Sequence, residues 1–307
     1  MRVIYADEKL CLNNTVVILG NFDGVHIAHQ SLIKEAVKIA EKKSLSSVVY
    51  TFSEHPQKKL FGDIKTITLN SEKEKIFSDL GVDVLVYQHP TKDFLNIPPE
   101  DFISDILVKS LGTKVIVVGE HYSFGCNASG NSNLLKTFSS KFGIVTHIMP
   151  LIFNDGELVS SSNIRKHIVS GEITRANKLL GREFCISGKI EHGNQMGNKM
   201  GFPTANISLM TEKVIPKYGV YACSVLIENT RYQGIANIGV KPTFDGEIPL
   251  IEVHLFNTNE NFYEKNATVN LYEFIREEIK FSDIYSLKNQ IEIDVKSVKE
   301  YFSYNLK

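Results

Sequence analysis

The sequence predicts an α/β region with a doubly wound parallel sheet, followed by an antiparallel β-barrel with a C-terminal helix. Two observations support this prediction. Up to about residue 181, apolar β-type runs alternate with helical patterns, which is typical of a parallel sheet with helices on both faces. From residue 182, short β-type runs follow one another across turn-rich segments, as in a closed barrel, until one long helical pattern ends the chain.

The first region contains five β-type runs separated by helical patterns. We expect its strands at residues 16–19, 47–52, 82–87, 114–118 and 144–148. A helix is expected after Asn70, because Ser71 and Glu74 have the spacing of a capping box. Two short helices are expected to close the region at Gly171 and Gly181, since glycine suits the left-handed residue that follows a helix.

The second region is dense in β-type runs. Its strands are expected at residues 184–190, 221–227, 232–238, 251–256 and 267–272. The last helical pattern has apolar residues three or four positions apart, which predicts the face that packs across the barrel: Leu287, Ile291, Val295, Val298 and Phe302. The change of pattern predicts two domains, at residues 1–181 and 182–307.

Composition limits the function classes. A chain of 307 residues with 43% hydrophobic and 22% charged residues is typical of two soluble domains. Its net charge of −1 gives no basic field, so we expect no nucleic-acid partner. The four cysteines lack CxxC spacing, the N-terminus does not resemble a signal peptide, and no apolar run reaches membrane-spanning length. We therefore expect a cytoplasmic protein with reduced thiols and no membrane partner, and the oligomeric state stays open.

The segment GNFDGVHIAHQ, residues 20–30, connects a β-type run to a helical pattern. Such a turn presents unpaired N–H groups and the positive end of the helix dipole, so it favours an anion. His26 and His29 are three residues apart and add two imidazoles to one face. We therefore expect a phosphate group to bind here.

Two other interpretations of the histidines are open. They could be zinc ligands, but an HExxH arrangement and a nearby cysteine pair are both missing from the sequence. They could also be a structural pair with satisfied hydrogen bonds. Gly20 and Gly24, which free the backbone, and Asp23, which adds a carboxylate that packing does not need, favour a binding turn instead.

The same segment resembles the GxFDGVHxGHQ signature of the FMN adenylyltransferase half of bacterial bifunctional FAD synthetases, a branch of the HxGH nucleotidyltransferases. TFSEHP at 51–56, VVGEHYSFG at 117–125 and SSSNIRKHIVSGEITRANKLLGR at 160–182 resemble later motifs of that family in the same order. The resemblance implies that His26, His29 and Arg165 are catalytic. It also implies a set of nucleotide and flavin contacts: Gly20, Phe22, Asp23, His55, His121, Ser160, Ser161 and Ser162.

This set of residues fits the chemistry of adenylyl transfer to a phosphate monoester. The attacking oxygen is already anionic near neutral pH, so positioning and charge neutralisation are needed rather than a nucleophile or base. Imidazoles, a guanidinium and hydroxyls supply both. Ser162 also suits the N-cap of the helix that carries Arg165, so capping is an alternative role for it.

The second region has its own motif, GNQMGNKMGFPTANI at 193–207. Thr204 and Asn206 offer hard oxygen ligands of the kind that Mg²⁺ prefers. The segment resembles the riboflavin kinase signature GxxxGRxxGFPTANI, and YGVYA, NIGVKPTF, IEVHLFN and FIREEIKF continue the match. The resemblance implies that ATP, Mg²⁺ and flavin are bound here by Thr204 and Asn206 together with Gly193, Gly197, Lys199, Gly201, Pro203, Asn237 and Arg276.

Glu252, in IEVHLFN, is the residue to which the kinase family assigns the role of base. A base is useful because the 5′-hydroxyl of riboflavin is not ionised near neutral pH. The alternation with Ile251 and Val253 leaves open that Glu252 only faces water. Arg276 could brace the flavin site, or it could form an exposed ion pair with Glu277 or Glu278; Phe281 and the last helix would give the flavin ring an apolar wall.

The sequence departs from these families at five positions: Ala28, Glu54, His121, Asn198 and Glu264. Ala28 replaces the glycine of HxGH, which matters if the backbone there has a positive φ or lies against adenine. Glu54 adds a negative charge close to a site for anions. We predict a bifunctional enzyme that converts riboflavin to FMN and FMN to FAD. The alternatives are a paralogue that keeps one activity and a flavin-binding regulator without turnover.

Overall fold

The computed structural model describes residues 1–6, 10–56, 64–191, 201–209, 212–243, 246–258 and 260–305. It divides into two compact units, residues 1–161 and residues 162–307. Residues 193–200 of the motif at 193–207 fall outside the described residues. Within the described part of the chain, no helix combines the length and the apolar character that crossing a bilayer requires.

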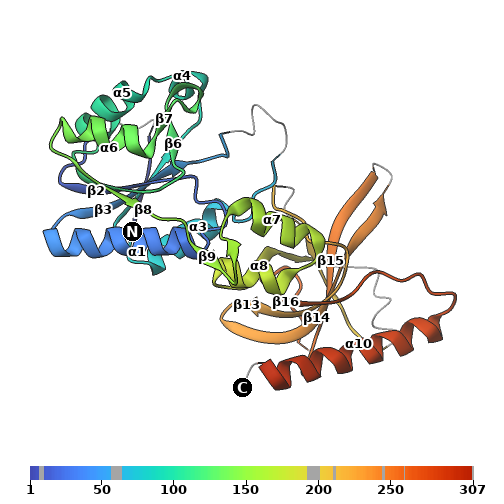
Figure 1. Ribbon diagram of the computed structural model, residues 1–307. Coiled ribbons are helices and arrows are strands. Elements are labelled where there is room, and N and C mark those ends of the chain that lie inside the picture. Colours follow the sequence, from blue (N-terminus) through green and yellow to red (C-terminus); the bar gives the residue numbers. More distant parts are fainter. Residues whose placement is uncertain are drawn as a thin grey trace. The chain divides into compact units, whose positions relative to one another are not determined.

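The first unit is built on a six-stranded parallel sheet in the order β1-β4-β3-β2-β5-β8 (Figure 1). Its strands are β1 Arg2–Tyr5, β2 Thr15–Leu19, β3 Ser46–Phe52, β4 Val84–Gln88, β5 Thr113–Gly119 and β8 Val145–Met149. The five predicted strands are confirmed to within two residues. The edge strand β1 was not predicted; it has four residues, and a single side chain of it, that of Ile4, is buried.

Helices cover both faces of this sheet, as predicted (Figure 1). The side chains of β2 alternate: Val16 and Ile18 pack with α1 Ile27–Lys43 and α3 Asn70–Asp79. Val17 and Leu19 pack on the other face, with the π-helix η1 Phe102–Ser110 and with α6 Ser132–Ser140. Short elements complete the unit: α4 Lys92–Leu95, α5 Pro99–Asp101, β6 Ser123–Phe124, η2 Cys126–Ala128, β7 Gly130–Asn131, β9 Phe153–Asn154 and β10 Glu157–Leu158.

The order of the strands places a topological switch point beside β2. The chain proceeds from β2 to β3 and β4 on one side, and then returns to β5 on the other side of β2. In open α/β sheets, ligands bind at the carboxyl ends of the strands at such a point. The predicted turn at residues 20–30 follows β2, and the predicted segment VVGEHYSFG contains the end of β5.

The start of α3 differs from the prediction. The capping glutamate is Glu72, whose carboxylate accepts a hydrogen bond from the N–H of Leu69 at 3.0 Å, and not Glu74. The position of the helix start is set by a residue outside the helix. The Asp23 carboxylate binds the N–H groups of Ile67 and Thr68, so the chain is already fixed at that point and turns into the helix two residues before Ser71.

The second unit contains a closed six-stranded barrel in the order β11-β12-β15-β14-β13-β16. Its strands are β11 Phe184–Glu191, β12 Ala205–Ser208, β13 Gly219–Ile227, β14 Thr230–Thr243, β15 Gly246–Leu255 and β16 Asn266–Arg276. The five predicted strands are present, and each is longer than predicted, β14 the most. The sixth strand, β12, comes from the segment that carries Thr204 and Asn206 and closes the barrel between β11 and β15.

Two short helices precede the barrel: α7 Ser161–Ser170, whose first residue is the last of the first unit, and α8 Ile173–Leu180. Gly171 and Gly181 follow them with φ values of +83° and +70°, as predicted. Asn177 fastens α8 to the barrel: its Nδ2 donates to the carbonyl of Leu271 at 2.8 Å, and its Oδ1 accepts from the N–H of Phe184 at 2.7 Å. The second compact unit begins at residue 162, earlier than the predicted domain boundary at 181/182. That boundary was inferred from a change of sequence pattern and stays a prediction.

The C-terminal helix α10, Ile284–Asn305, lies along the outside of the barrel (Figure 1). Val298 and Phe302 pack on Val220, Ala222 and Tyr272. These strand residues face outward, because their neighbours Tyr221 and Cys223 are buried inside the barrel. The predicted packing of this helix across the barrel is confirmed.

Candidate functional site

The turn after β2 is shaped by Gly20 and Phe22. The Phe22 ring lies so close to Gly20 that a Cβ there would approach its Cζ to 2.9 Å. Phe22 itself has a φ of +50° and is fully buried, with its ring edge-to-face against His29 at 5.1 Å and against Phe77 at 5.7 Å. Both residues therefore shape the turn, and Phe22 supports the ring of His29.

His26 and His29 begin α1 with their rings stacked. The ring centroids are 3.6 Å apart, and the planes differ by 15°. His26 is the N-cap of α1: its Nδ1 accepts the N–H of His29 at 3.3 Å. Nδ1 therefore carries no proton in this arrangement, and the proton of the neutral ring is on Nε2. The N–H groups of Ile27 and Ala28 have no acceptor within the helix, because they lie in its first turn.

Ala28 lies inside α1 and is absent from the residues with positive φ. The left-handed conformations of the turn belong instead to Phe22, Gly24 and Val25. The methyl group that replaces the glycine of HxGH therefore strains no backbone. Glu264, another departure from the family, does stand at a positive φ of +68°, which costs a residue other than glycine about 1 kcal/mol.

Asp23 joins three segments of the first unit. Its Oδ1 accepts the N–H groups of Ile67 and Thr68 at 2.9 and 3.3 Å, and its carbonyl accepts the hydroxyl of Ser161 at 2.8 Å. Ser161 is the first residue of α7, so Ser162 lies within the first turn and not at the N-cap as expected. Ser160, directly before the helix, is half-buried.

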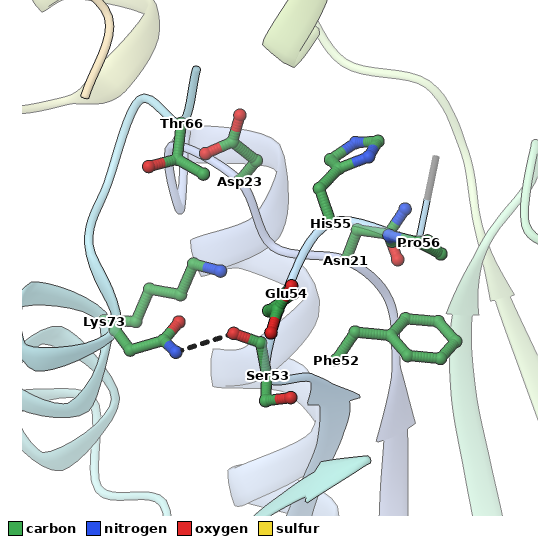
Figure 2. Close-up of a pocket in the computed structure, with 10 residues that line it drawn as sticks. Asn21, Asp23, Phe52, Ser53, Glu54, His55, Pro56, Thr66 and Lys73 are labelled. Atoms are coloured by element: carbon green, nitrogen blue, oxygen red, sulfur yellow. Dashed lines mark hydrogen bonds between the residues drawn. The ribbon is translucent and has the colours of Figure 1, made fainter. Parts of the chain in front are cut away.

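A pocket adjoins this turn on the side of β3 and α3 (Figure 2). It has an empty volume of about 310 Å³, open solvent at its mouth included. The lining residues come from the turn, from the end of β3, and from the start of α3 and the segment before it: Asn21, Asp23, Phe52, Ser53, Glu54, His55, Pro56, Thr66, Asn70 and Lys73. Two predicted site residues, Asp23 and His55, thus meet here. Glu54, which departs from the family motif, lines the same pocket.

Other predicted residues lie elsewhere. His121 is exposed in the turn after β5 and does not line this pocket. Arg165 is half-buried on α7, in the second unit. Gly193, Gly197, Lys199 and the departure Asn198 lie outside the described residues. Gly201 is described, with a φ of +87°, and Pro203 is exposed.

In the barrel, three predicted residues form one row across neighbouring strands. Glu252 on β15 is directly opposite Asn206 on β12 and directly opposite Asn237 on β14. Residues in such positions have Cβ atoms about 4.5–5.5 Å apart. Ile251 and Val253 are buried, so the row lies on the outer face of the barrel, where Glu252 is exposed and Asn206 is 6% exposed.

His254 fixes the segment that leads into β12. Its Nδ1 lies 2.9 Å from the carbonyl of Pro203, to which it donates, and its ring packs edge-to-face on Phe202 at 5.3 Å. Burial lowers the pKa of His254, and the bond to Pro203 acts in the opposite direction. Thr204 directly precedes β12 and is half-buried, so the strand alternation that places Asn206 does not extend to it. Of the two predicted metal ligands, Asn206 shares the face of Glu252.

Arg276 is held by the C-terminal helix, and not by the expected Glu277 or Glu278 side chain. Its Nε and Nη2 donate to the carboxylate of Asp294 at 2.9 and 2.7 Å, and its Nη1 donates to the backbone carbonyl of Glu277 at 2.8 Å. Phe281 lies against the guanidinium at 6.0 Å. The pair therefore fastens α10 to the end of β16.

We expect Asp294→Ala to lower the free energy of unfolding by about 3 kcal/mol, because it leaves a partly buried guanidinium without its counter-charge. Asp294 is 4% and Arg276 is 19% exposed at the side chain. Urea unfolding followed by far-ultraviolet circular dichroism measures the change, since the chain has no tryptophan. Glu292→Ala, at an exposed position of the same helix, is the control; equal stability of the two variants would contradict the expectation.

Two residues near these sites were not singled out from the sequence. Lys73 lines the pocket beside the turn, but its run of charged neighbours resembles a solvated helix face. Glu278 lies over the row on the barrel: its Oε1 accepts from the Nδ2 of Asn237 at 3.4 Å, and a Cβ on Gly239 would meet it. Glu278 stands in the motif FIREEIKF, where its position beside Arg276 suggests an ion pair with that residue and gives no sign of a contact with Asn237.

The chain matches two family models. One is described as FAD synthetase and matches residues 8–163; the other is described as riboflavin kinase and matches residues 180–302. A solved structure titled as a macrolide-efflux protein from Streptococcus pneumoniae aligns over the whole of both chains, with a TM-score of 0.90 and 30% identity. Its title names a different activity, and the likeness in fold extends over both units.

Full-length relatives carry one description, bifunctional riboflavin kinase/FMN adenylyltransferase. The protein of Buchnera aphidicola subsp. Schizaphis graminum is 39% identical over 95% of each chain, and that of Listeria monocytogenes serovar 1/2a is 35% identical over 99% of each. The Escherichia coli K12 protein is 34% identical over 94% of this chain and 92% of its own. The chain therefore belongs to the bifunctional riboflavin kinase/FMN adenylyltransferase family.

Proposed function

We propose that this chain makes both flavin nucleotides. In the barrel it phosphorylates riboflavin with ATP, giving FMN and ADP. In the parallel-sheet unit it transfers an adenylyl group from ATP to FMN, giving FAD and pyrophosphate. The observation that supports this most directly is the row of Asn206, Glu252 and Asn237, because a carboxylate flanked by two amides on an accessible face suits phosphoryl transfer to an alcohol.

In the kinase reaction, Glu252 accepts the proton of the riboflavin 5′-hydroxyl as that oxygen attacks the γ-phosphate of ATP. Asn206, directly opposite Glu252, and Thr204, two residues earlier in the chain, offer neutral oxygens that fit Mg²⁺, an ion that keeps several of its waters. Bound there, the ion would neutralise charge on the phosphates of ATP. Asn206 is nearly buried, which holds its amide in one orientation next to Glu252.

In the adenylyl transfer, the turn after β2 binds the phosphates of ATP. The Nε2–H of His26 and the first-turn N–H groups of α1 donate to phosphate oxygens, and the helix dipole adds positive charge. Preorganised donors of this kind stabilise charge that develops on the departing pyrophosphate. No base is required, because the phosphate of FMN is already an anion. The catalytic role predicted for Arg165 stays a prediction.

The substrates of this function are riboflavin, FMN and ATP. It calls for no nucleic-acid partner. The cytoplasmic location also stays a prediction, and the oligomeric state stays open.

The test is product analysis by chromatography after incubation of the full chain with riboflavin, ATP and Mg²⁺. We expect FMN to appear first and FAD to follow. A parallel incubation with FMN in place of riboflavin should give FAD directly. FMN as the sole product would show a kinase that has lost adenylyl transfer, and no turnover in either incubation would leave the flavin-binding regulator as the better description.

A further inference from the structure

Lys73 is a charged side chain buried beside the candidate nucleotide turn. It lies on the first turns of α3, and 6% of it is exposed. Figure 2 shows its side chain reaching from the helix into the pocket, toward Asp23 and Glu54. Burial of a lysine without hydrogen bonds is costly, so its position calls for a reason.

Asp23 is the nearby carboxylate that could balance the charge of Lys73, but it already accepts hydrogen bonds from the backbone. Its Oδ1 accepts the N–H groups of Ile67 and Thr68. Within the described residues, no hydrogen bond or ion pair joins the ammonium of Lys73 to a protein acceptor. Burial lowers the pKa of Lys73, and the charge of Asp23 offsets this in part. The ammonium is therefore poised to gain from an additional anion in the pocket.

The surroundings indicate which anion this is. The pocket adjoins the turn, because Asn21 and Asp23 line it, and Thr66 adds a hydroxyl. Phe52 gives it an apolar wall and is itself supported edge-to-face by Phe94 at 5.8 Å. A ligand with a phosphate at one end and an aromatic ring system near it matches these features.

We propose that Lys73 binds the phosphate of FMN and holds it for attack on ATP, an assignment that rests on the proposed adenylyltransferase function. Two polyanions must approach each other in this reaction, and a buried ammonium between them reduces their repulsion. Desolvation strengthens this interaction, because the charge is screened less in the pocket than it would be in water. In this position Lys73 is a binding residue for the flavin nucleotide and leaves the phosphates of ATP to the turn.

The test compares Lys73→Met with Lys75→Met in the full chain. Methionine keeps much of the length of lysine without its charge, and Lys75 is exposed on the same helix. We expect Lys73→Met to raise the KM for FMN in FAD formation about 10-fold or more, the scale of one lost charge-assisted hydrogen bond. The KM for ATP and the kinase turnover should stay within about twofold of the wild type, and Lys75→Met should change none of them.

Wild-type FAD formation in the same assay tests the proposed function separately. If the wild type converts FMN to FAD but Lys73→Met raises the KM for ATP instead, or raises neither KM, the assignment of Lys73 is wrong. Recovery of the wild-type KM for FMN in the double variant Asp23→Asn/Lys73→Met would also overturn it, because Lys73 would then only balance the charge of Asp23. If Lys73→Met fails to fold, Lys73→Gln, which keeps a polar end in the pocket, replaces it in the same comparisons.

Discussion

Glu252→Gln should reduce the formation of FMN from riboflavin by about 10²- to 10⁴-fold, the range for loss of a general base. Glutamine has the shape of glutamate and can stay between Asn206 and Asn237, so the barrel is expected to fold as before. Conversion of FMN to FAD should be unchanged, because it takes place in the other unit. Initial rates with riboflavin and with FMN, measured on the same preparation, give both values.

The barrel offers a matched control for this variant. Glu191 on β11 is directly opposite Asn206 on the side away from Glu252, so it belongs to the same row and is also exposed. Its carboxylate accepts the hydroxyl of Ser208 at 2.9 Å. We expect Glu191→Gln to keep kinase turnover within about threefold. Equal losses in the two variants would mean that the row needs negative charge in general and not a base at Glu252.

His26→Asn should lower adenylyl transfer by about 10²-fold or more, the scale for removal of one preorganised donor. Asparagine is among the best N-cap residues, so its Oδ1 can take over the acceptor role of Nδ1 toward the N–H of His29. The variant therefore removes the imidazole while it keeps the helix start. Kinase turnover should be unaffected. His29→Ala should show a similar loss of FAD formation, since it removes the second ring of the stack.

A third variant separates the two roles of His26, the N-cap of α1 and the Nε2–H donor to phosphate. His26→Ala loses both, and we expect it to be about 1 kcal/mol less stable than His26→Asn but no less active. The melting temperature of each variant and the rate of FAD formation are the two readouts. Full activity in His26→Asn would show that His26 serves the helix alone, and the role assigned to its Nε2–H would be wrong.

The sequence predicted the strands that carry strong apolar runs, and the reasons for the failures are physical. β1 has four residues and pairs on one side only, so its pattern is weak. β12 is equally short and follows a glycine-containing segment, so it was not predicted as a barrel strand. The start of α3 depends on Asp23, more than forty residues earlier in the chain, which no local spacing reveals.

The sequence named candidate residues of the barrel one by one, but it did not predict how they are arranged. Motif and alternation gave Glu252, Asn206 and Asn237 separately, but their alignment depends on the pairing register of three strands, which is a long-range property. Arg276 was placed near the flavin site, yet its partner Asp294 lies on a helix whose docking could not be inferred at residue level. Lys73 was missed because a buried lysine and a solvated one look the same in a charged run.

The alternation along β15 limits which insertions this family can accept. Glu252 faces out while Ile251 and Val253 face in. One extra residue in the strand before Ile251 would therefore turn the carboxylate into the barrel interior and expose the two apolar side chains. A change of length in this strand would therefore remove activity and stability together. Length differences among relatives should be found in the loops. A homologue with an odd number of residues inserted in this strand should have lost its kinase activity.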